Sequence, residues 1–244
     1  MRRGVSSVLT RIVVTGGQGS LASSLKPYFP FAEYPSKAEL NVADSGSCKA
    51  YFSARSVDLI LHLAAETHHS APSESYVMNN IVGTANVVLW AKRKHARLVY
   101  TSTDYVYPGT AGGYTETATL QPIGAYGMSK LGGEMAVQQY DQSLTIRGSW
   151  YSRLDYPQAA TDAFTSRIPI TDAARLIAPL STSTLTGVIN VGGVRRSVYE
   201  IVSTEFNPRT RPVTRVHITG QAYPIPADTS LDTTVLHDFL RSHR

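Results

Sequence analysis

The sequence predicts an α/β fold with a doubly wound parallel sheet, helices on both of its faces, and a small C-terminal lobe. Short apolar runs rich in β-forming residues alternate with longer helical patterns, and this order is typical of parallel sheets. Beyond residue 150 the chain becomes rich in Pro, Thr, Ser and Arg and its periodicity weakens, which indicates the smaller lobe. The predicted strands are residues 11–15, 57–63, 97–102, 144–147 and 187–191, and the predicted helices are residues 20–26, 45–54, 72–95 and 123–140.

The composition is that of one compact domain with a modest appendage. A chain of 244 residues can bury one sizeable core, and 42% hydrophobic with 17% charged residues is typical of globular proteins. We place a boundary near residue 147, between a domain 1–147 and a lobe 148–244 that is partly interleaved with it. The single cysteine, Cys48, cannot form an internal disulfide, so a cytoplasmic location is expected. No run approaches the ~20 apolar residues that cross a bilayer, so no membrane segment is expected.

The charge pattern favours a small anionic partner over a nucleic acid. The formal net charge is +5, but the basic residues are scattered and no basic stripe with interleaved aromatic residues is present. Phosphorylated small molecules suit this charge. The group of His62, His68 and His69 with Glu66 fits no standard zinc spacing, so no metal is expected.

A glycine-rich turn at residues 15–22 follows the first predicted strand directly and precedes a predicted helix. Glycines allow a tight turn and a close approach of the backbone to a pyrophosphate, whose charge lies at the helix N-terminus among free N–H groups. Ala22 keeps the helix and the strand close together. The strand-turn-helix context of Gly16, Gly19 and Ala22 therefore predicts a dinucleotide site on a Rossmann-type sheet rather than an ordinary turn.

The residues about twenty positions beyond the turn distinguish NAD from NADP. An acidic side chain there binds the ribose hydroxyls of NAD, whereas a basic side chain favours the extra phosphate of NADP. Ser36 and Lys37 occupy this region, flanked by Glu33 and Glu39. The sequence thus favours NADP and leaves NAD open, and the alternative for Lys37 is a solvated loop position.

Tyr126 and Lys130 lie four residues apart on a predicted helix, which places the phenol and the ammonium on one face. The phenol of a free tyrosine has a pKa of ~10, so this pKa must fall by roughly 3 before the phenol can act as an acid or base near neutral pH. A nearby ammonium and an oxidised nicotinamide ring both lower the pKa of a phenol. Thr103 follows the strand 97–102, where ligands of α/β folds bind, so its hydroxyl can hold a carbonyl while Tyr126 supplies the proton. These residues predict hydride transfer to or from a carbonyl.

The predicted helix 72–95 is apolar nearly all round. One stripe can cover the sheet while another meets a second subunit, so a homodimer through helices 72–95 and 123–140 is one interpretation. Burial of the helix within one subunit is the other.

Taken together, these motifs resemble the extended short-chain dehydrogenase/reductase family over most of residues 11–147. The resemblance includes the glycine turn, the catalytic pair, residues 63–65 after a strand and residues 80–84 in the long helix. Within the family, residues 102–107 and 230–233 are most similar to dTDP-4-dehydrorhamnose reductases. The resemblance implies reduction of a 4-keto nucleotide sugar with NADPH or NADH, and a substrate lobe that is shortened in this chain.

The resemblance also implies a role for each matched residue. Asn80 is expected to support a proton relay through a backbone-bound water. The catalytic set is Thr103, Tyr126 and Lys130. The expected cofactor contacts are Gly16, Gln18, Gly19, Ser20 and Leu21 at the pyrophosphate, Lys37 at the extra phosphate, Asn41 and Val42 near adenine, and Leu63, Ala64, Ala65, Asn80, Thr101, Tyr126 and Lys130 toward the ribose and nicotinamide.

Two other functions stay open. The first is a nucleotide-sugar 4-epimerase that holds NAD tightly, and the second is a non-catalytic NADP-binding regulatory subunit, which the shortened lobe favours. A 4,6-dehydratase is disfavoured, because Asp104-Tyr105 stands where those enzymes carry an Asp-Glu pair. Arg153 or Arg167 can hold a diphosphate, with a surface position as the alternative for each, and Trp150 is expected to be a packing residue.

Overall fold

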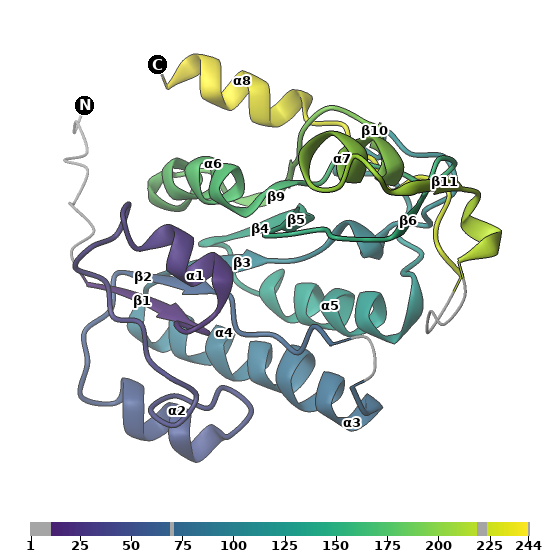
Figure 1. Cartoon of the computed structure of the whole chain (residues 1–244). Helices are drawn as coiled ribbons and strands as arrows, with labels where there is room; N and C mark the ends of the chain where they lie inside the picture. Colours follow the sequence, from purple (N-terminus) through teal and green to yellow (C-terminus); the bar gives the residue numbers. More distant parts are fainter. Residues whose placement is uncertain (1–10, 69–70, 219–223, 244) are drawn as a thin grey trace.

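A computed structural model describes residues 11–68, 71–218 and 224–243 and contains a central sheet of five parallel strands in the order β1-β2-β3-β4-β9 (Figure 1). The apolar runs form these strands because both faces of the sheet are covered; all four residues of β2, for example, are buried. The sheet confirms the predicted α/β class and each predicted strand. The strands are β1 (Ile12–Thr15), β2 (Leu59–His62), β3 (Arg97–Thr101), β4 (Ser143–Gly148) and β9 (Gly187–Val191).

Helices cover both faces of the sheet, as the doubly wound prediction requires (Figure 1). On one face, α1, α6 and α8 pack onto a core cluster that includes Val14, Leu61 and Ile177. On the other face, α2, α4 and α5 enclose a second cluster around Phe52 and Leu98. These helices are α1 (Ser20–Leu25), α2 (Ser45–Phe52), α4 (Gly83–Lys94), α5 (Gly124–Val137), α6 (Ile170–Thr182) and α8 (Thr234–Ser242).

The predicted helix 72–95 is continuous but changes its winding along its length. It begins as α3 (Ser73–Tyr76), passes through a π-helical segment η1 (Val77–Val82), and continues as α4. Segments of this kind occur frequently at functional sites. Here the π-helical segment carries the fully buried Asn80. The helix ends at His95, whose φ of 52° is left-handed and whose N–H binds the carbonyl of Ala91.

Exposed apolar side chains lie on η1, α4 and α5, the segments predicted to form a dimer interface. Their exposed fractions range from 38% for Met78 to 64% for Met128. Such positions are compatible with a subunit contact, and the homodimer stays a prediction. Within the described ranges, no helix is both long and apolar enough to cross a membrane.

The chain beyond residue 147 contributes both to the central layers and to a small lobe. β9 and α6 belong to the central layers, whereas Tyr151, Ile201 and Val202 form a separate core cluster. The division into 1–147 and 148–244 stays a prediction. The lobe contains three two-stranded sheets, which pair β5 (Trp150–Tyr151) with β8 (Ile168–Pro169), β6 (Gln158–Ala160) with β11 (Arg211–Val213), and β7 (Phe164–Thr165) with β10 (Arg196–Ser197). It also contains α7 (Val198–Glu205) and the 3-10 turn η3 (Arg215–His217).

One element beside β1 was not predicted from the sequence. Glu33 forms an isolated parallel bridge with Val13, in which Val14 N donates to Glu33 O over 2.9 Å and Glu33 N donates to Ile12 O over 2.8 Å. This bridge holds the following loop, which carries Lys37, beside the glycine turn.

Candidate active site

Three adjoining cavities line the carboxyl edge of the parallel strands, where ligands of α/β folds bind. The first and middle cavities share Gly16, Gly19, Leu63 and Ala65. The middle and third cavities share Thr67, Ser102, Tyr126 and Trp150. Their volumes are about 250, 270 and 350 Å³ respectively. The shared linings make them one groove that runs from Lys37 to Arg167.

The glycine turn keeps the floor of the first cavity open. Gly16 has a left-handed φ of 69°, and a Cβ added there would lie 2.8 Å from the backbone nitrogen of Ala64. A Cβ on Gly17 would lie 2.4 Å from the carbonyl carbon of Tyr34. Any larger residue would therefore push the backbone out of place, so the turn can keep this shape only with glycine. The first turn of α1 has no side-chain cap, and the arrangement fits a dinucleotide pyrophosphate.

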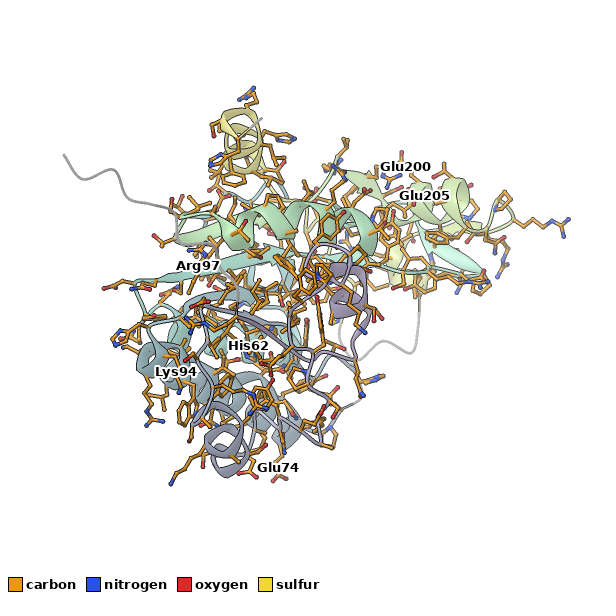
Figure 2. All side chains as sticks on the ribbon, turned by 90° about the vertical axis from the view of Figure 1, so that its left-hand side faces the viewer. His62, Glu74, Lys94, Arg97, Glu200 and Glu205 are labelled. Atoms are coloured by element: carbon orange, nitrogen blue, oxygen red, sulfur yellow. The ribbon has the colours of Figure 1, made fainter. Side chains whose placement is uncertain are left out.

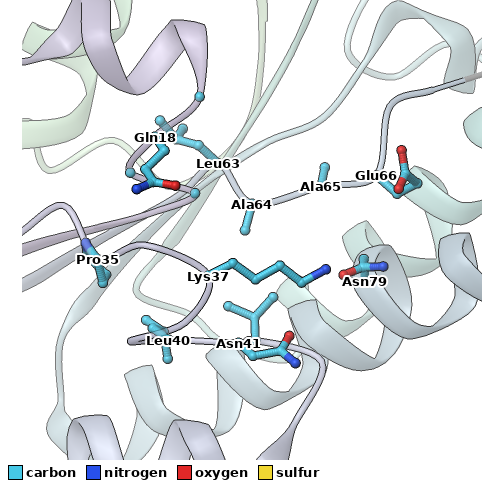
Figure 3. Close-up of a pocket in the computed structure, with 14 residues that line it drawn as sticks. Gln18, Pro35, Lys37, Leu40, Asn41, Leu63, Ala64, Ala65, Glu66 and Asn79 are labelled. Atoms are coloured by element: carbon cyan, nitrogen blue, oxygen red, sulfur yellow. The ribbon is translucent and has the colours of Figure 1, made fainter.

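Lys37 is the cationic side chain of the first cavity. Figure 3 shows it extending across the cavity below Ala64 and Ala65 toward Asn79. Ser36, its predicted companion, instead binds Glu39 through both its N–H and its hydroxyl, at 2.8 Å each. Of this predicted pair, only Lys37 lines the cavity.

Lys130 lies on α5 at the base of the middle cavity, and its Nζ is 4.2 Å from the centre of the Tyr100 ring. Burial lowers the pKa of Lys130 to about 7, and the negative charge of Glu134, one helical turn further on, raises it in part. Glu134 itself is fully buried and pairs with Arg147, with 2.7 Å between Oε2 and Nη2. The buried carboxylate on the same helix thus opposes, only in part, the effect of burial on Lys130.

Thr103 and Tyr126 line the third cavity together. We expected Lys130 to lower the pKa of Tyr126, and this expectation is wrong for the chain's own side chains. Burial raises the pKa of the Tyr126 phenol well above its ordinary value, the negative charge of Asp104 raises it further, and a hydrogen bond with Thr103 lowers it only in part. In the chain without cofactor, the phenol therefore holds its proton at neutral pH.

Beneath the cofactor side of the groove, a buried hydrogen-bond chain joins β1, β2 and the long helix. Figure 2 shows its central member, His62, in the interior of the molecule. Thr84 Oγ1 gives its hydrogen to Asn80 O over 2.7 Å, so His62 Nε2 must donate to Thr84 Oγ1 over 3.0 Å. His62 Nδ1 then accepts from Thr15 Oγ1 over 2.7 Å. Burial and the charge of Lys130 lower the pKa of His62 to about 3, which keeps the ring neutral.

Asn80 does not line the groove but positions two of its walls. Its side chain accepts a hydrogen bond from Glu66 N over 2.7 Å and donates to Ser129 Oγ over 2.8 Å. Asn80 thereby ties the loop after β2 to α5. Its predicted part in a proton relay stays a prediction, and its carbonyl already accepts a hydrogen bond from Thr84.

With the exception of Asn80, every residue predicted to contact the cofactor or to act in catalysis lines the groove. Sequence reasoning missed several others. The missed lining residues include Gly17, Pro35, Leu40, Glu66 and Asn79 in the first cavity, and Thr67, Ser102, Asp104, Tyr105 and Ser149 in the third.

The two candidate arginines have different positions. Arg167 lines the third cavity, whereas Arg153 is exposed and pairs with Asp155 at 2.8 Å. Trp150 packs against the core as expected and also lines two of the cavities. His69 lies outside the described residues; within them, no group of three or more His, Cys, Asp or Glu side chains is placed to hold a metal.

Comparison with known sequences assigns the family. The profile of the RmlD substrate binding domain matches residues 10–166, which is more than half of the chain. The chain belongs to this family. The match confirms the predicted resemblance to extended short-chain dehydrogenases/reductases and to dTDP-4-dehydrorhamnose reductases.

Two curated relatives illustrate the range of functions near this chain. Methionine adenosyltransferase 2 subunit beta of Xenopus laevis is 33% identical over 111 residues, which are 44% of this chain and 33% of the relative. The dTDP-4-keto-6-deoxy-D-glucose reductase of Streptomyces niveus is 30% identical over 150 residues, which are 57% of this chain and 52% of the relative. The chain thus spans about half the length, or less, of these relatives.

Two solved structures share the fold along nearly the whole chain. The dTDP-4-dehydrorhamnose reductase of Bacillus anthracis, solved in complex with NADP, superposes with a TM-score of 0.86 at 22% identity and covers 95% of this chain and 93% of its own. WbmG of Bordetella bronchiseptica, in complex with NAD and UDP, gives 0.77 at 20% identity, with coverages of 95% and 88%.

Proposed function

We propose that this chain is a reductase that uses NADPH to reduce the 4-keto group of a nucleotide-linked sugar. The observation that carries the proposal is the groove, which joins the glycine turn, Lys130, Tyr126 and Thr103 in one continuous space. Membership of the RmlD family and the names of the reductase relatives support the same reaction. Lys37 supports NADP as the cofactor, and NAD stays open.

The chain's own residues supply the placement and the proton. When bound, the nicotinamide supplies the hydride. Tyr126 donates to the carbonyl oxygen of the substrate in the third cavity and gives it its proton as negative charge develops there. Thr103 holds the same oxygen by turning its hydroxyl hydrogen, which Asp104 Oδ1 accepts in the free chain, toward the substrate. Lys130 lies one turn along α5 and faces the middle cavity, where its ammonium grips the ribose and favours the phenolate that remains.

The test is to follow NADPH and NADH absorbance with purified protein against a panel of 4-keto nucleotide sugars. Oxidation of NADPH with at least one member, lost in Tyr126→Phe, is the expected result. If no member is reduced with either cofactor, the proposal is wrong. NAD that stays bound in stoichiometric amount through purification would instead favour the 4-epimerase.

A regulatory subunit is the second candidate, and the relatives named methionine adenosyltransferase 2 subunit beta favour it. Such a protein would use the first and middle cavities to bind a dinucleotide and would have no turnover to lose. The two candidates differ in one measurement, because Tyr126→Phe would abolish reduction in an enzyme but leave the function of a binding subunit unchanged.

A further inference from the structure

A continuous chain of buried hydrogen bonds runs from the residue before the glycine turn to the backbone of Tyr126. Its five side chains come from β1, β2, the long helix and α5, and each is at most 3% exposed. In order, the links are Thr15 Oγ1 to His62 Nδ1 at 2.7 Å, His62 Nε2 to Thr84 Oγ1 at 3.0 Å, Thr84 Oγ1 to Asn80 O at 2.7 Å, Asn80 Nδ2 to Ser129 Oγ at 2.8 Å and Ser129 Oγ to Tyr126 O at 2.8 Å. The chain thus connects the cofactor side of the groove with the residue proposed to supply the proton.

The donors in this chain all point the same way. The hydroxyl of Ser129 gives its one hydrogen to Tyr126 O, so Ser129 Oγ accepts from Asn80 Nδ2. Likewise, the hydroxyl of Thr84 gives its hydrogen to Asn80 O, so the ring of His62 donates through Nε2 and accepts through Nδ1. Hydrogen bonds aligned in one direction polarise one another, and each link therefore strengthens the next.

His62 is the member that joins the two ends of the chain. A neutral imidazole carries a donor and an acceptor on separate atoms of a rigid ring, whereas Asn and Gln carry both on one flexible amide group. Burial and the charge of Lys130 lower the pKa of His62 to about 3, which keeps the ring in this form. The ring also stacks on Tyr100, with 5.5 Å between the centroids, and Tyr100 bonds both Lys130 O, over 3.1 Å, and Thr84.

The first link of the chain lies directly beneath the glycine turn. Thr15 Oγ1 also accepts a hydrogen bond from Ala64 N over 3.3 Å. Ala64 N is in turn the backbone atom that a Cβ on Gly16 would meet, and both residues line the first cavity. A histidine that only satisfied the core would need partners, but its partners would not have to lead to both halves of the groove.

We propose that His62 is a positioning residue that couples the seat of the dinucleotide to the placement of Tyr126. It holds the glycine turn through Thr15, and it holds the backbone of Tyr126 through the links that begin at Thr84. His62 is fully buried and is not among the residues that line the three cavities, so it acts only through these neighbours. The proposal rests on the proposed function, because it concerns the cofactor and the proton donor of that reaction.

Two substitutions of His62 separate the two directions of the chain. His62→Asn keeps an acceptor near the position of Nδ1 and can keep the bond from Thr15, but it does not reach Thr84. His62→Gln places an amide N–H near the position of Nε2 and can keep the bond to Thr84, but not the bond from Thr15.

The two variants should therefore have opposite effects on cofactor binding and turnover. The dissociation constant of NADP should rise roughly tenfold in His62→Gln and change by less than about threefold in His62→Asn, as expected for the loss of one hydrogen bond. The turnover number should instead fall roughly tenfold or more in His62→Asn, because Tyr126 is then misplaced, and stay near the wild-type value in His62→Gln. If both variants lose affinity and turnover to the same extent, the histidine has only a structural role and the inference is overturned.

Hydrogen exchange followed by mass spectrometry tests the coupling without turnover. The probe is adenosine 2′,5′-bisphosphate, which lacks the nicotinamide and its ribose. None of the described residues that line the first cavity, which this probe would fill, belongs to α5. In the wild type, the bound probe should slow the exchange of α5 amides by about fivefold or more, the lower end of ordinary coupling between two sites. Ser129→Ala and Thr84→Val each cut the chain and should remove this slowing while the probe still binds.

Ser181→Ala is the matched control for Ser129→Ala. Ser181 is fully buried and donates to Ile177 O over 2.7 Å, so it makes the same kind of bond, from a serine hydroxyl to a carbonyl of its own helix. It lies on α6, which covers the other face of the sheet, and it is not part of the chain. This variant should keep the wild-type slowing on α5.

The outcomes distinguish the coupling from the proposed function. Slowing on α5 that Ser129→Ala and Thr84→Val remove, in a protein that reduces no sugar, would refute the reductase and support the coupling. Reduction of a sugar, with α5 exchange that the probe leaves unchanged or with slowing that survives in both variants, would overturn the coupling and leave the reductase standing. If neither NADP nor the probe binds, both are refuted. If the His62 variants do not fold, Ser129→Ala and Thr84→Val, which leave the histidine in place, decide alone.

Discussion

Arg147 on β4 and Glu134 on α5 form a buried ion pair, and we expect Arg147→Met to be strongly destabilising. The two side chains are 2% and 0% exposed. Arg147 also donates to Tyr107 Oη over 2.9 Å and to Glu116 O over 3.0 Å. Its loss would leave the buried Glu134 carboxylate without its ion-pair partner and two further acceptors without this donor. Breaking such a pair costs about 3–5 kcal/mol of unfolding free energy, and the added acceptors favour the upper end.

Urea unfolding followed by circular dichroism measures this loss, provided that the slope with denaturant stays constant. Arg147→Met combined with Glu134→Met should recover at least half of the lost stability, since apolar replacement of a whole buried pair is often neutral. The control is Arg175→Met, which breaks an exposed pair with Asp172 and should cost about 1 kcal/mol or less. A loss below about 1 kcal/mol in Arg147→Met, or a double variant as unstable as the single one, would refute this reasoning.

Three further predictions concern the groove. Tyr126→Phe should lower the turnover number by roughly 10² to 10⁴ in the reductase assay, whereas Tyr28→Phe, at an exposed position, should not change it. Lys37→Ala should raise the dissociation constant of NADP by roughly 10- to 100-fold and leave that of NAD unchanged, because a charged hydrogen bond contributes about 1.5–3 kcal/mol. Lys49→Ala serves as the control. An equal effect of Lys37→Ala on both cofactors would contradict the assignment of Lys37 to the extra phosphate. In cofactor-free protein, the folded-state pKa of Lys130, about 7, lies below the unfolded value near 10.5, so the unfolded chain binds the extra proton between these values. Urea unfolding should show stability rising from pH 7 toward pH ~10 by up to about 1.4 kcal/mol per unit, and a flat profile would be inconsistent with a buried Lys130 ammonium.

The sequence predicted the central layers well because their signals are local. An apolar run such as β2 is buried on both faces, and a parallel strand of this kind is recognisable from composition alone. The pairing of Glu33 with Val13 could not be predicted in this way, since a single bridge has no periodicity. The π-helical winding around Asn80 also could not be predicted, because it does not alter the apolar pattern of the helix in the sequence.

The lining of the groove was predictable where a motif is local in the sequence, as in the glycine turn or the pair Tyr126 and Lys130, four residues apart. It was not predictable where the cavity joins segments that are distant in sequence. Arg167 had two open interpretations, and only the fold brings it into the lining of the third cavity together with Asp104. Trp150 was predicted to pack against the core, as it does, but its residue type does not indicate that it also lines a cavity.

The raised pKa of Tyr126 shows what the spacing of Tyr126 and Lys130 along a helix does not reveal. Spacing along a helix indicates that Lys130 is near, but it gives no measure of how far burial opposes ionisation. The folded chain adds a second effect that spacing hides, since the charge of Asp104 also disfavours the phenolate. Both effects keep the proton on Tyr126, and a reductase needs that proton at the start of its reaction, whereas an alcohol oxidation needs the phenolate. In the chain without cofactor, burial and the Asp104 charge therefore favour the protonated phenol that the proposed reduction requires at its start.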